Sequence, residues 1–135
     1  MHLFAYGTLL VPEIWLAVTG RECESVEAML PGYTIRRVRG GDFPGILRSD
    51  DASVTGRVFL DLDAETVARL DRYEDSFYER IEVAPRNPRG QALTAQAYVV
   101  PDRHADVLSD EAWTLGWFRE HALHDYLARL PGQDR

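Results

Sequence analysis

The sequence contains no lysine, since all 15 basic residues in the 135-residue chain are arginine. This absence excludes a Schiff-base lysine, lysine-anchored pyridoxal phosphate and a phosphate loop of the Walker type. There is one cysteine, Cys23, so no internal disulfide can form. Its neighbours Glu22 and Glu24 disfavour the thiolate that a catalytic cysteine needs. A single cysteine also fits a reducing compartment, and we expect a cytoplasmic location.

Long apolar runs and excess positive charge are missing as well. No stretch is long and apolar enough to span a membrane. The apolar residues 3–18 lack a basic leader and include Gly7, Pro12 and Glu13, so we interpret them as part of the fold rather than a signal peptide. A net charge of −7 and a pI of about 5.0 disfavour nucleic acid as a partner. We expect a monomer or a weak homodimer that uses no membrane or nucleic-acid partner.

The length and composition indicate one globular domain. A chain of 135 residues with 45% hydrophobic and 27% charged residues has the usual size and balance of a single core-forming unit. We find no internal repeat and no low-complexity segment. We therefore expect one domain over residues 1–130 and a C-terminal tail over residues 131–135.

The hydrophobic periodicity predicts more strands than helices. Strands are expected at residues 2–6, 33–38, 54–62, 78–84 and 94–100, with turns or loops at 31–32, 39–46 and 85–90. Helices are expected at residues 12–20, at 64–73 after the N-cap Asp63, and from Ser109 or Asp110 onward. Adjacent strand pairs favour an α+β fold with a mixed or antiparallel sheet.

Two stretches carry candidate chemistry. Gly7 permits a tight turn directly after the first strand, where successive amides can bind an anion; the candidate binding residues are Tyr6, Gly7, Thr8 and Leu9. Glu74 follows the helix predicted at residues 64–73, between aromatic residues and beside Asp75. Apolar neighbours and a like charge raise the pKa of a carboxyl group, which suits a general base. Taken singly, each stretch also fits an ordinary strand exit or a solvated helix end.

Other reactive side chains lack the partners that a site needs. His121 and His124 share a helix face, but the sequence provides no further metal ligand at a recognised spacing. Trp113 and Trp117 are expected to serve in core packing or a subunit contact. We therefore expect no metal and no cofactor.

Several motifs occur in the order typical of one enzyme family. They are Tyr6-Gly7-Thr8-Leu9, Phe43-Pro44-Gly45-Ile46, Val54-Thr55-Gly56-Arg57-Val58-Phe59, Leu70 to Glu74, Tyr78-Glu79-Arg80, and a late strand over residues 94–99. Together they resemble the gamma-glutamylcyclotransferase-like family, especially its gamma-glutamylamine cyclotransferase branch. The resemblance covers most of residues 2–100. One departure is Asp75, where many members have glycine after the catalytic glutamate.

The resemblance implies a fold and an activity. The fold would be a small mixed β-barrel with flanking helices. The activity would be release of 5-oxoproline from a γ-glutamyl amine or γ-glutamyl amino acid, a transferase or lyase chemistry that requires no metal. Glu74 matches the catalytic general acid and base of the family, and residues 6–9 match its substrate-binding loop. We expect the two to meet in one cavity that is also lined by Phe43 and Tyr78.

Two other functions remain open at this stage. One is a binding module of the same fold that holds a small carboxylate without turnover, since fold does not imply function. The other is a hydrolase of a related amide, with Glu74 activating water. The enzyme hypotheses are favoured by Glu74, because a carboxylate would repel an anionic ligand and gives a simple binder no advantage.

Overall fold

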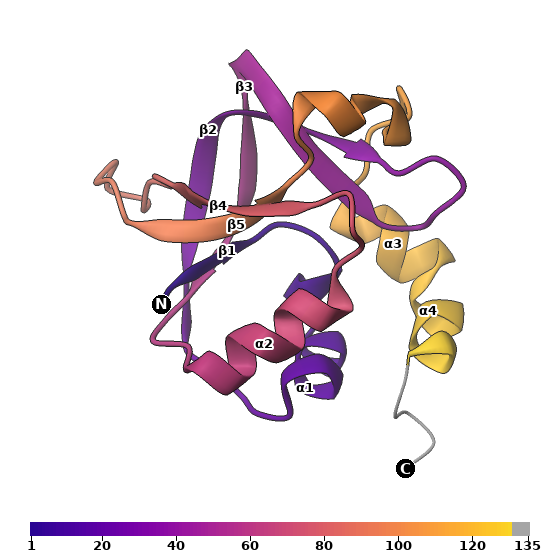
Figure 1. Ribbon diagram of the computed structural model, residues 1–135, viewed down its shortest axis with the longest axis horizontal. Coiled ribbons are helices and arrows are strands. Elements are labelled where there is room, and N and C mark those ends of the chain that lie inside the picture. The colour runs from indigo at the N-terminus through magenta and orange to yellow at the C-terminus, as the bar shows by residue number, and fades with distance from the viewer. Residues whose placement is uncertain (131–135) are drawn as a thin grey trace.

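The computed structural model describes residues 1–130 and contains one five-stranded sheet with helices packed beside it (Figure 1). The strands are β1 (Leu3–Ala5), β2 (Ser25–Arg37), β3 (Pro44–Phe59), β4 (Glu79–Val83) and β5 (Ala95–Val99). The helices are η1 (Thr8–Leu10), α1 (Pro12–Thr19), α2 (Ala64–Tyr73), η2 (Asp102–Val107), α3 (Leu115–His121) and α4 (Leu123–Arg129). The strand order is β2-β3-β1-β5-β4. This arrangement confirms the expected α+β class.

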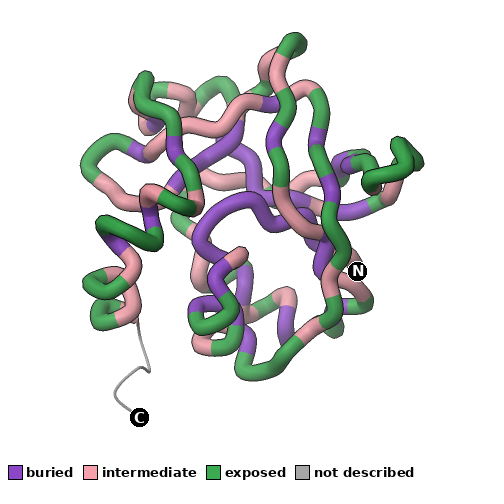
Figure 2. The backbone as a smooth tube through the Cα atoms, turned by 180° about the vertical axis from the view of Figure 1, so that it is seen from behind, coloured by how far each residue is buried: buried purple, intermediate pink, exposed green. Residues whose placement is uncertain are grey.

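Strand β1 lies at the centre of the sheet and is buried on both faces. It pairs antiparallel with β3 and parallel with β5, so the sheet is mixed. Successive side chains of a strand point to opposite faces. Leu3 and Ala5 therefore pack into the core under the helices, while Phe4 and Tyr6 pack into a second core on the other face. Buried backbone runs through the interior of the molecule, and exposed turns lie at its periphery (Figure 2).

The expected mixed sheet is present, but it does not close into a barrel. The five strands make an open sheet, with β2 and β4 at its two ends. One bridge pair, Met29 with Arg86, connects β2 to the segment after β4 through hydrogen bonds of 2.9 and 2.8 Å. The two edges thus approach each other at a single point rather than along a ladder.

A long β2–β3 hairpin replaces three separately predicted pieces. The predicted turn at residues 31–32 lies within β2, where Gly32 adopts a φ of 85° and the register shifts between Pro31 and Tyr33. The loop predicted at residues 39–46 is shorter, because β3 already begins at Pro44. The sequence signals were correct about local backbone geometry, but wrong about whether the strands end there.

Gly56 on β3 allows the close approach of β1. A Cβ atom at this position would lie 2.2 Å from the Ala5 carbonyl oxygen. We expect Gly56→Ala to lower the free energy of unfolding by about 3 kcal/mol, because the clash is with backbone that cannot move aside. Gly116→Ala is the matched control, because nothing lies within 4 Å of its added Cβ and Ala is favoured in a helix by roughly 0.5 kcal/mol. Urea unfolding measures both; equal stabilities would contradict the prediction.

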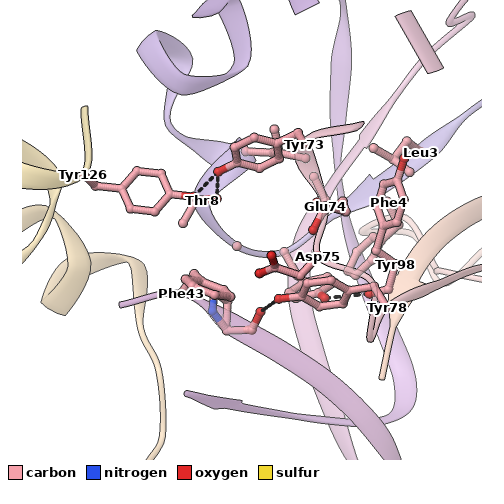
Figure 3. A pocket seen from close by; sticks show the side chains of 15 residues that line it. Leu3, Phe4, Thr8, Phe43, Tyr73, Glu74, Asp75, Tyr78, Tyr98 and Tyr126 are labelled. Atoms are coloured by element: carbon pink, nitrogen blue, oxygen red, sulfur yellow. Dashed lines mark hydrogen bonds between the residues drawn. The ribbon is translucent and has the colours of Figure 1, made fainter. Parts of the chain in front are cut away.

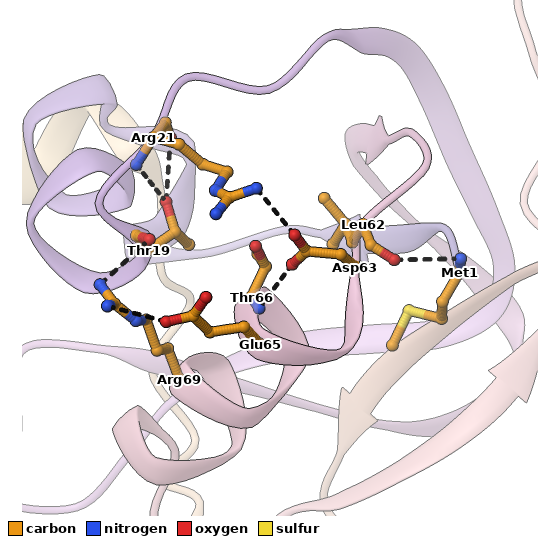
Figure 4. Close-up of polar contacts among 8 residues, drawn as sticks. All are labelled: Met1, Thr19, Arg21, Leu62, Asp63, Glu65, Thr66 and Arg69. Atoms are coloured by element: carbon orange, nitrogen blue, oxygen red, sulfur yellow. Dashed lines mark hydrogen bonds and ion pairs between the residues drawn. The ribbon is translucent and has the colours of Figure 1, made fainter.

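Helix α2 is fixed at its start by local capping and by contacts to α1 (Figure 4). Asp63 accepts a hydrogen bond of 2.8 Å from the Thr66 amide, as an N-cap residue does, and forms an ion pair of 2.8 Å with Arg21. Arg69 pairs with Glu65 at 3.2 Å and donates to the Thr19 carbonyl oxygen at 3.3 Å. The predicted bounds of α2 are confirmed. Because the helix is held in this way, the position of its C-terminal end is also fixed.

The C-terminal helical region differs from the single helix expected from Ser109 or Asp110. Helix α3 begins only at Leu115, where the Thr114 side chain accepts a hydrogen bond of 3.1 Å from the Trp117 amide. At Ala122 the backbone leaves helical geometry with a φ of −131°, and α4 follows. The predicted tail at residues 131–135 lies outside the described residues. Helices α3 and α4 therefore form a bent pair beside the sheet (Figure 1).

Candidate active site

The loop after β1 and the C-terminal end of α2 meet at one cavity (Figure 3). Its volume is about 60 Å³, roughly the space of two water molecules, so a larger ligand must extend through its mouth. The lining includes the predicted residues Tyr6, Gly7, Thr8, Leu9, Phe43, Glu74 and Tyr78. Segments more than 60 positions apart in the sequence are thus brought together, as expected from the sequence.

The loop 6–9 is shaped by packing on both sides. A Cβ atom on Gly7 would lie 2.8 Å from Cγ of Pro44, so only glycine fits between the loop and the start of β3. The buried Tyr6 donates a hydrogen bond of 2.6 Å from its hydroxyl to the Tyr98 carbonyl oxygen. Thr8 begins the turn η1, and the first amides of a helical turn have no partner within it. These amides are therefore available to donate hydrogen bonds to a negatively charged ligand atom.

Glu74 lies directly after α2 and is half-buried. Its backbone amide closes the helix on the Leu70 carbonyl oxygen at 3.2 Å, but within residues 1–130 its side chain makes no hydrogen bond or ion pair. Burial, followed by the charges of Asp75 and Asp71, raises the pKa of Glu74 from 4.5 to about 8. A carboxyl group with a pKa near neutrality can both accept and return a proton under physiological conditions.

A neighbouring ion pair keeps the nearest strand arginine away from Glu74. Arg80 of β4 contacts Asp71 at 2.9 Å, and Tyr98 donates a hydrogen bond of 2.6 Å to the same carboxylate. Burial opposes the charged form of Asp71, but the hydrogen bonds from Arg80 and Tyr98 outweigh it and lower its pKa. Arg80 thus pairs with Asp71 and forms no ion pair with Glu74.

Seven of the 15 residues that line the cavity are aromatic. The hydroxyl of Tyr78 donates a hydrogen bond of 2.5 Å to the Pro44 carbonyl oxygen, which connects the segment before β4 to the start of β3. Tyr73, Tyr98 and Tyr126 also line the cavity. The sequence alone did not identify these three tyrosines as residues of the site. Tyr73 adjoins Glu74 in sequence and was therefore detectable, whereas nothing local to Tyr98 or Tyr126 indicates the cavity.

The remaining candidates stay outside this site. Neither His121 nor His124 lines the cavity, and Trp113 is buried in the core beneath the helices. Among residues 1–130 no group of three or more His, Cys, Asp or Glu side chains is arranged to hold a metal ion. Over the same residues, no helix combines the length and apolar character needed to cross a bilayer.

The fold is α+β, and one cavity is lined both by a carboxyl group that has no partner among residues 1–130 and by the first turn of η1. Residues 3–115 match the model of the family described as "Gamma-glutamyl cyclotransferase, AIG2-like". The chain belongs to this family. The sequence resemblance noted above is thereby confirmed, while the family match stops before most of α3 and all of α4.

Individual relatives agree with this assignment. The chain is 29% identical over 127 residues to AIG2-like protein C from Arabidopsis thaliana, covering 93% of this chain and 73% of that protein. It spans 60% of the length of AIG2-like protein A from the same plant.

Solved structures share the fold. A solution structure from Arabidopsis thaliana superposes with a TM-score of 0.72 at 23% identity, covering 94% of this chain and 77% of the other. A structure described as gamma-glutamyl cyclotransferase superposes with a TM-score of 0.65 at 21% identity, covering 73% of this chain and 65% of the other.

Proposed function

We propose that the protein is a γ-glutamylcyclotransferase that releases 5-oxoproline from a γ-glutamyl amine or γ-glutamyl amino acid. The observation that carries this proposal is the position of Glu74, a half-buried carboxyl group without a partner among residues 1–130, on the same small cavity as the amides of residues 7–9. Family membership supports the reaction class, because the family includes gamma-glutamyl cyclotransferases.

The reaction is an intramolecular aminolysis. The α-amine of the γ-glutamyl group attacks its own γ-carbonyl carbon, a five-membered ring closes, and the γ-amide C–N bond breaks. Holding the substrate folded supplies much of the acceleration, because attacking and attacked atoms belong to one molecule. The proton lost by the attacking amine passes to Glu74 and then to the departing amine, so no external acid is consumed.

The raised pKa of Glu74 is compatible with this role. In the free site the carboxyl group is mostly neutral at pH 7, because its pKa is about 8. A bound substrate brings an ammonium group next to it, and an adjacent positive charge favours the carboxylate form. The carboxylate then removes one proton from the ammonium group, which produces the amine nucleophile, and passes this proton to the departing nitrogen. The second proton, lost when the ring nitrogen becomes an amide, follows by the same route, so that the amine leaves as an ammonium ion. The amides of residues 7–9 stabilise either the α-carboxylate of the substrate or the oxyanion that develops during attack.

A product screen tests this function. The purified chain is incubated with γ-glutamyl amines, γ-glutamyl dipeptides and ε-(γ-glutamyl)-lysine, and the products are identified by mass spectrometry. We expect 5-oxoproline together with an equal amount of the free amine. Free glutamate instead of 5-oxoproline would identify an amide hydrolase in which Glu74 activates water. Saturable binding without turnover of any compound would identify the small-carboxylate-binding module.

A further inference from the structure

One wall of the cavity comes from a part of the chain that the family model does not match. That match ends at residue 115, yet Tyr126 of α4 lines the cavity together with Glu74. Figure 3 shows Tyr126 entering from α4 and lying, with Phe43, on the side of the cavity away from Leu3 and Phe4. The site is therefore incomplete without the C-terminal helix.

A chain of hydroxyl groups connects α4 to the loop after β1. The Tyr126 hydroxyl hydrogen-bonds to the Tyr73 hydroxyl, which in turn hydrogen-bonds to the Thr8 side chain at 2.8 Å. Tyr73 is the last residue of α2 and immediately precedes Glu74. The three hydroxyls thus tie together the helix that carries Glu74, the amide turn and α4.

Helix α4 is held against the cavity by contacts on either side of Tyr126. The Tyr126 ring meets the buried Phe118 edge-on, with ring centroids 5.2 Å apart. In the last turn of α4, Arg129 forms an ion pair of 3.2 Å with Asp42, the residue before Phe43. Asp42 is also 3.6 Å from Arg37. These contacts place the Tyr126 ring next to the segment that contains Phe43, which lies on the same side of the cavity (Figure 3).

We propose that Tyr126 is a positioning residue of this site. Its ring closes one wall and keeps water from the Glu74 carboxyl group, and its hydroxyl fixes Tyr73 and, through Tyr73, the Thr8 side chain. This inference rests on the proposed function, since it assigns a role within the same reaction. It also extends the site beyond the residues that match the family.

Three substitutions separate the two parts of the proposal. Tyr126→Phe keeps the ring and removes only the hydroxyl. Tyr126→Ala removes the ring that forms the wall. Tyr126→Leu keeps some apolar packing, but its side chain is too short to reach Tyr73. The Leu variant therefore replaces the Ala variant if the Ala variant does not fold. Leu127→Ala is the matched control, because Leu127 is a partly buried residue of α4 that packs on the same core but does not line the cavity.

The first measurement is a carbon-13 NMR titration of the Glu74 carboxyl group, identified by its absence in Glu74→Gln. Other titratable groups that face Glu74 are Asp71 and Asp75 at the end of α2, Tyr6 after β1, Tyr73 on α2, Tyr78 before β4, Tyr98 on β5 and Tyr126 itself. We expect Tyr126→Ala and Tyr126→Leu to lower the Glu74 midpoint by about one pH unit or more, because water enters beside the carboxyl group. Tyr126→Phe and Leu127→Ala should leave it near the wild-type value.

The second measurement is the rate of 5-oxoproline formation. We expect kcat/KM to fall by about tenfold or more in Tyr126→Ala and by a smaller factor, roughly threefold, in Tyr126→Phe, whereas Leu127→Ala should lose thermal stability with little change in kcat/KM. An unchanged Glu74 midpoint in both Tyr126→Ala and Tyr126→Leu would overturn the proposal. The titration requires no turnover, so its outcome stands even if the product screen finds no cyclotransferase activity.

Discussion

Replacing Glu74 with Gln is expected to reduce 5-oxoproline formation by about 10²- to 10⁴-fold, the usual contribution of a general acid or base. Glutamine has the size of glutamate and is uncharged like the protonated carboxyl group, but it cannot accept the proton of the substrate ammonium group. The Glu74 side chain makes no hydrogen bond or ion pair within residues 1–130, so the substitution breaks no structural contact there. The variant should fold normally and bind 5-oxoproline.

The matched control for this experiment is Glu82→Gln on β4. Glu82 is exposed and does not line the cavity, and its substitution makes the same chemical change, a carboxyl group to a carboxamide, outside the site. Turnover is measured by mass spectrometry of 5-oxoproline and folding by circular dichroism. A folded Glu74→Gln protein with the activity of Glu82→Gln would eliminate the proposed acid–base mechanism.

The elements that could be predicted from the sequence are those defined by local chemistry. Helix α2 has the predicted bounds because the Asp63 cap acts on the amide of Thr66, three positions away. Helix α1 begins at Pro12 and is followed by Gly20 with a φ of 77°, as its start and stop signals indicated. Such signals require no knowledge of the rest of the fold.

The errors arose where tertiary pairing overrode a local signal. Pro31 and Gly32 favour a turn, but β2 continues through them because β3 offers a partner on both sides of the register shift. Leu115 to Leu130 follow one helical hydrophobic period, yet the chain bends at Ala122, which is itself buried in the core. A helical period of hydrophobic residues shows which side chains face inward, but it does not show whether the backbone remains in one straight helix.

The candidate site was predictable to the extent that residues of unusual character marked it. Gly7 and Glu74 both stand where an element ends. Each position alone also fits an ordinary strand exit or a solvated helix end, and the family resemblance joined the two into one candidate site. Nothing in the sequence distinguishes Tyr98 and Tyr126 from other tyrosines, because tyrosine is common on strands and on amphipathic helices. Their place in the wall depends on how β5 and α4 pack, which only the three-dimensional structure reveals.

The half-buried carboxyl group of Glu74 should also make the free energy of unfolding depend on pH. Its pKa of 4.5 in the unfolded chain rises to about 8 in the folded protein, mainly through burial. Between these values the folded state binds more protons than the unfolded state, so the free energy of unfolding decreases as the pH rises. The contribution is fully present below pH 4.5 and is lost by about pH 8. With each pKa unit equivalent to about 1.4 kcal/mol, the whole effect is on the order of 5 kcal/mol.

Urea unfolding of wild type, Glu74→Gln and Glu82→Gln at pH 5 and pH 8.5 measures this effect. Glutamine resembles the protonated carboxyl group at every pH, so we expect Glu74→Gln to match wild type within about 1 kcal/mol at pH 5 and to exceed it by several kcal/mol at pH 8.5. Glu82→Gln changes an exposed side chain outside the cavity and should show no comparable gain between the two pH values. Contributions from all other titrating groups are shared by the three proteins and cancel in the differences.

If Glu74→Gln gains no more stability between pH 5 and pH 8.5 than Glu82→Gln does, then Glu74 is already ionised in the folded protein, and the cavity does not shield it as the structure indicates.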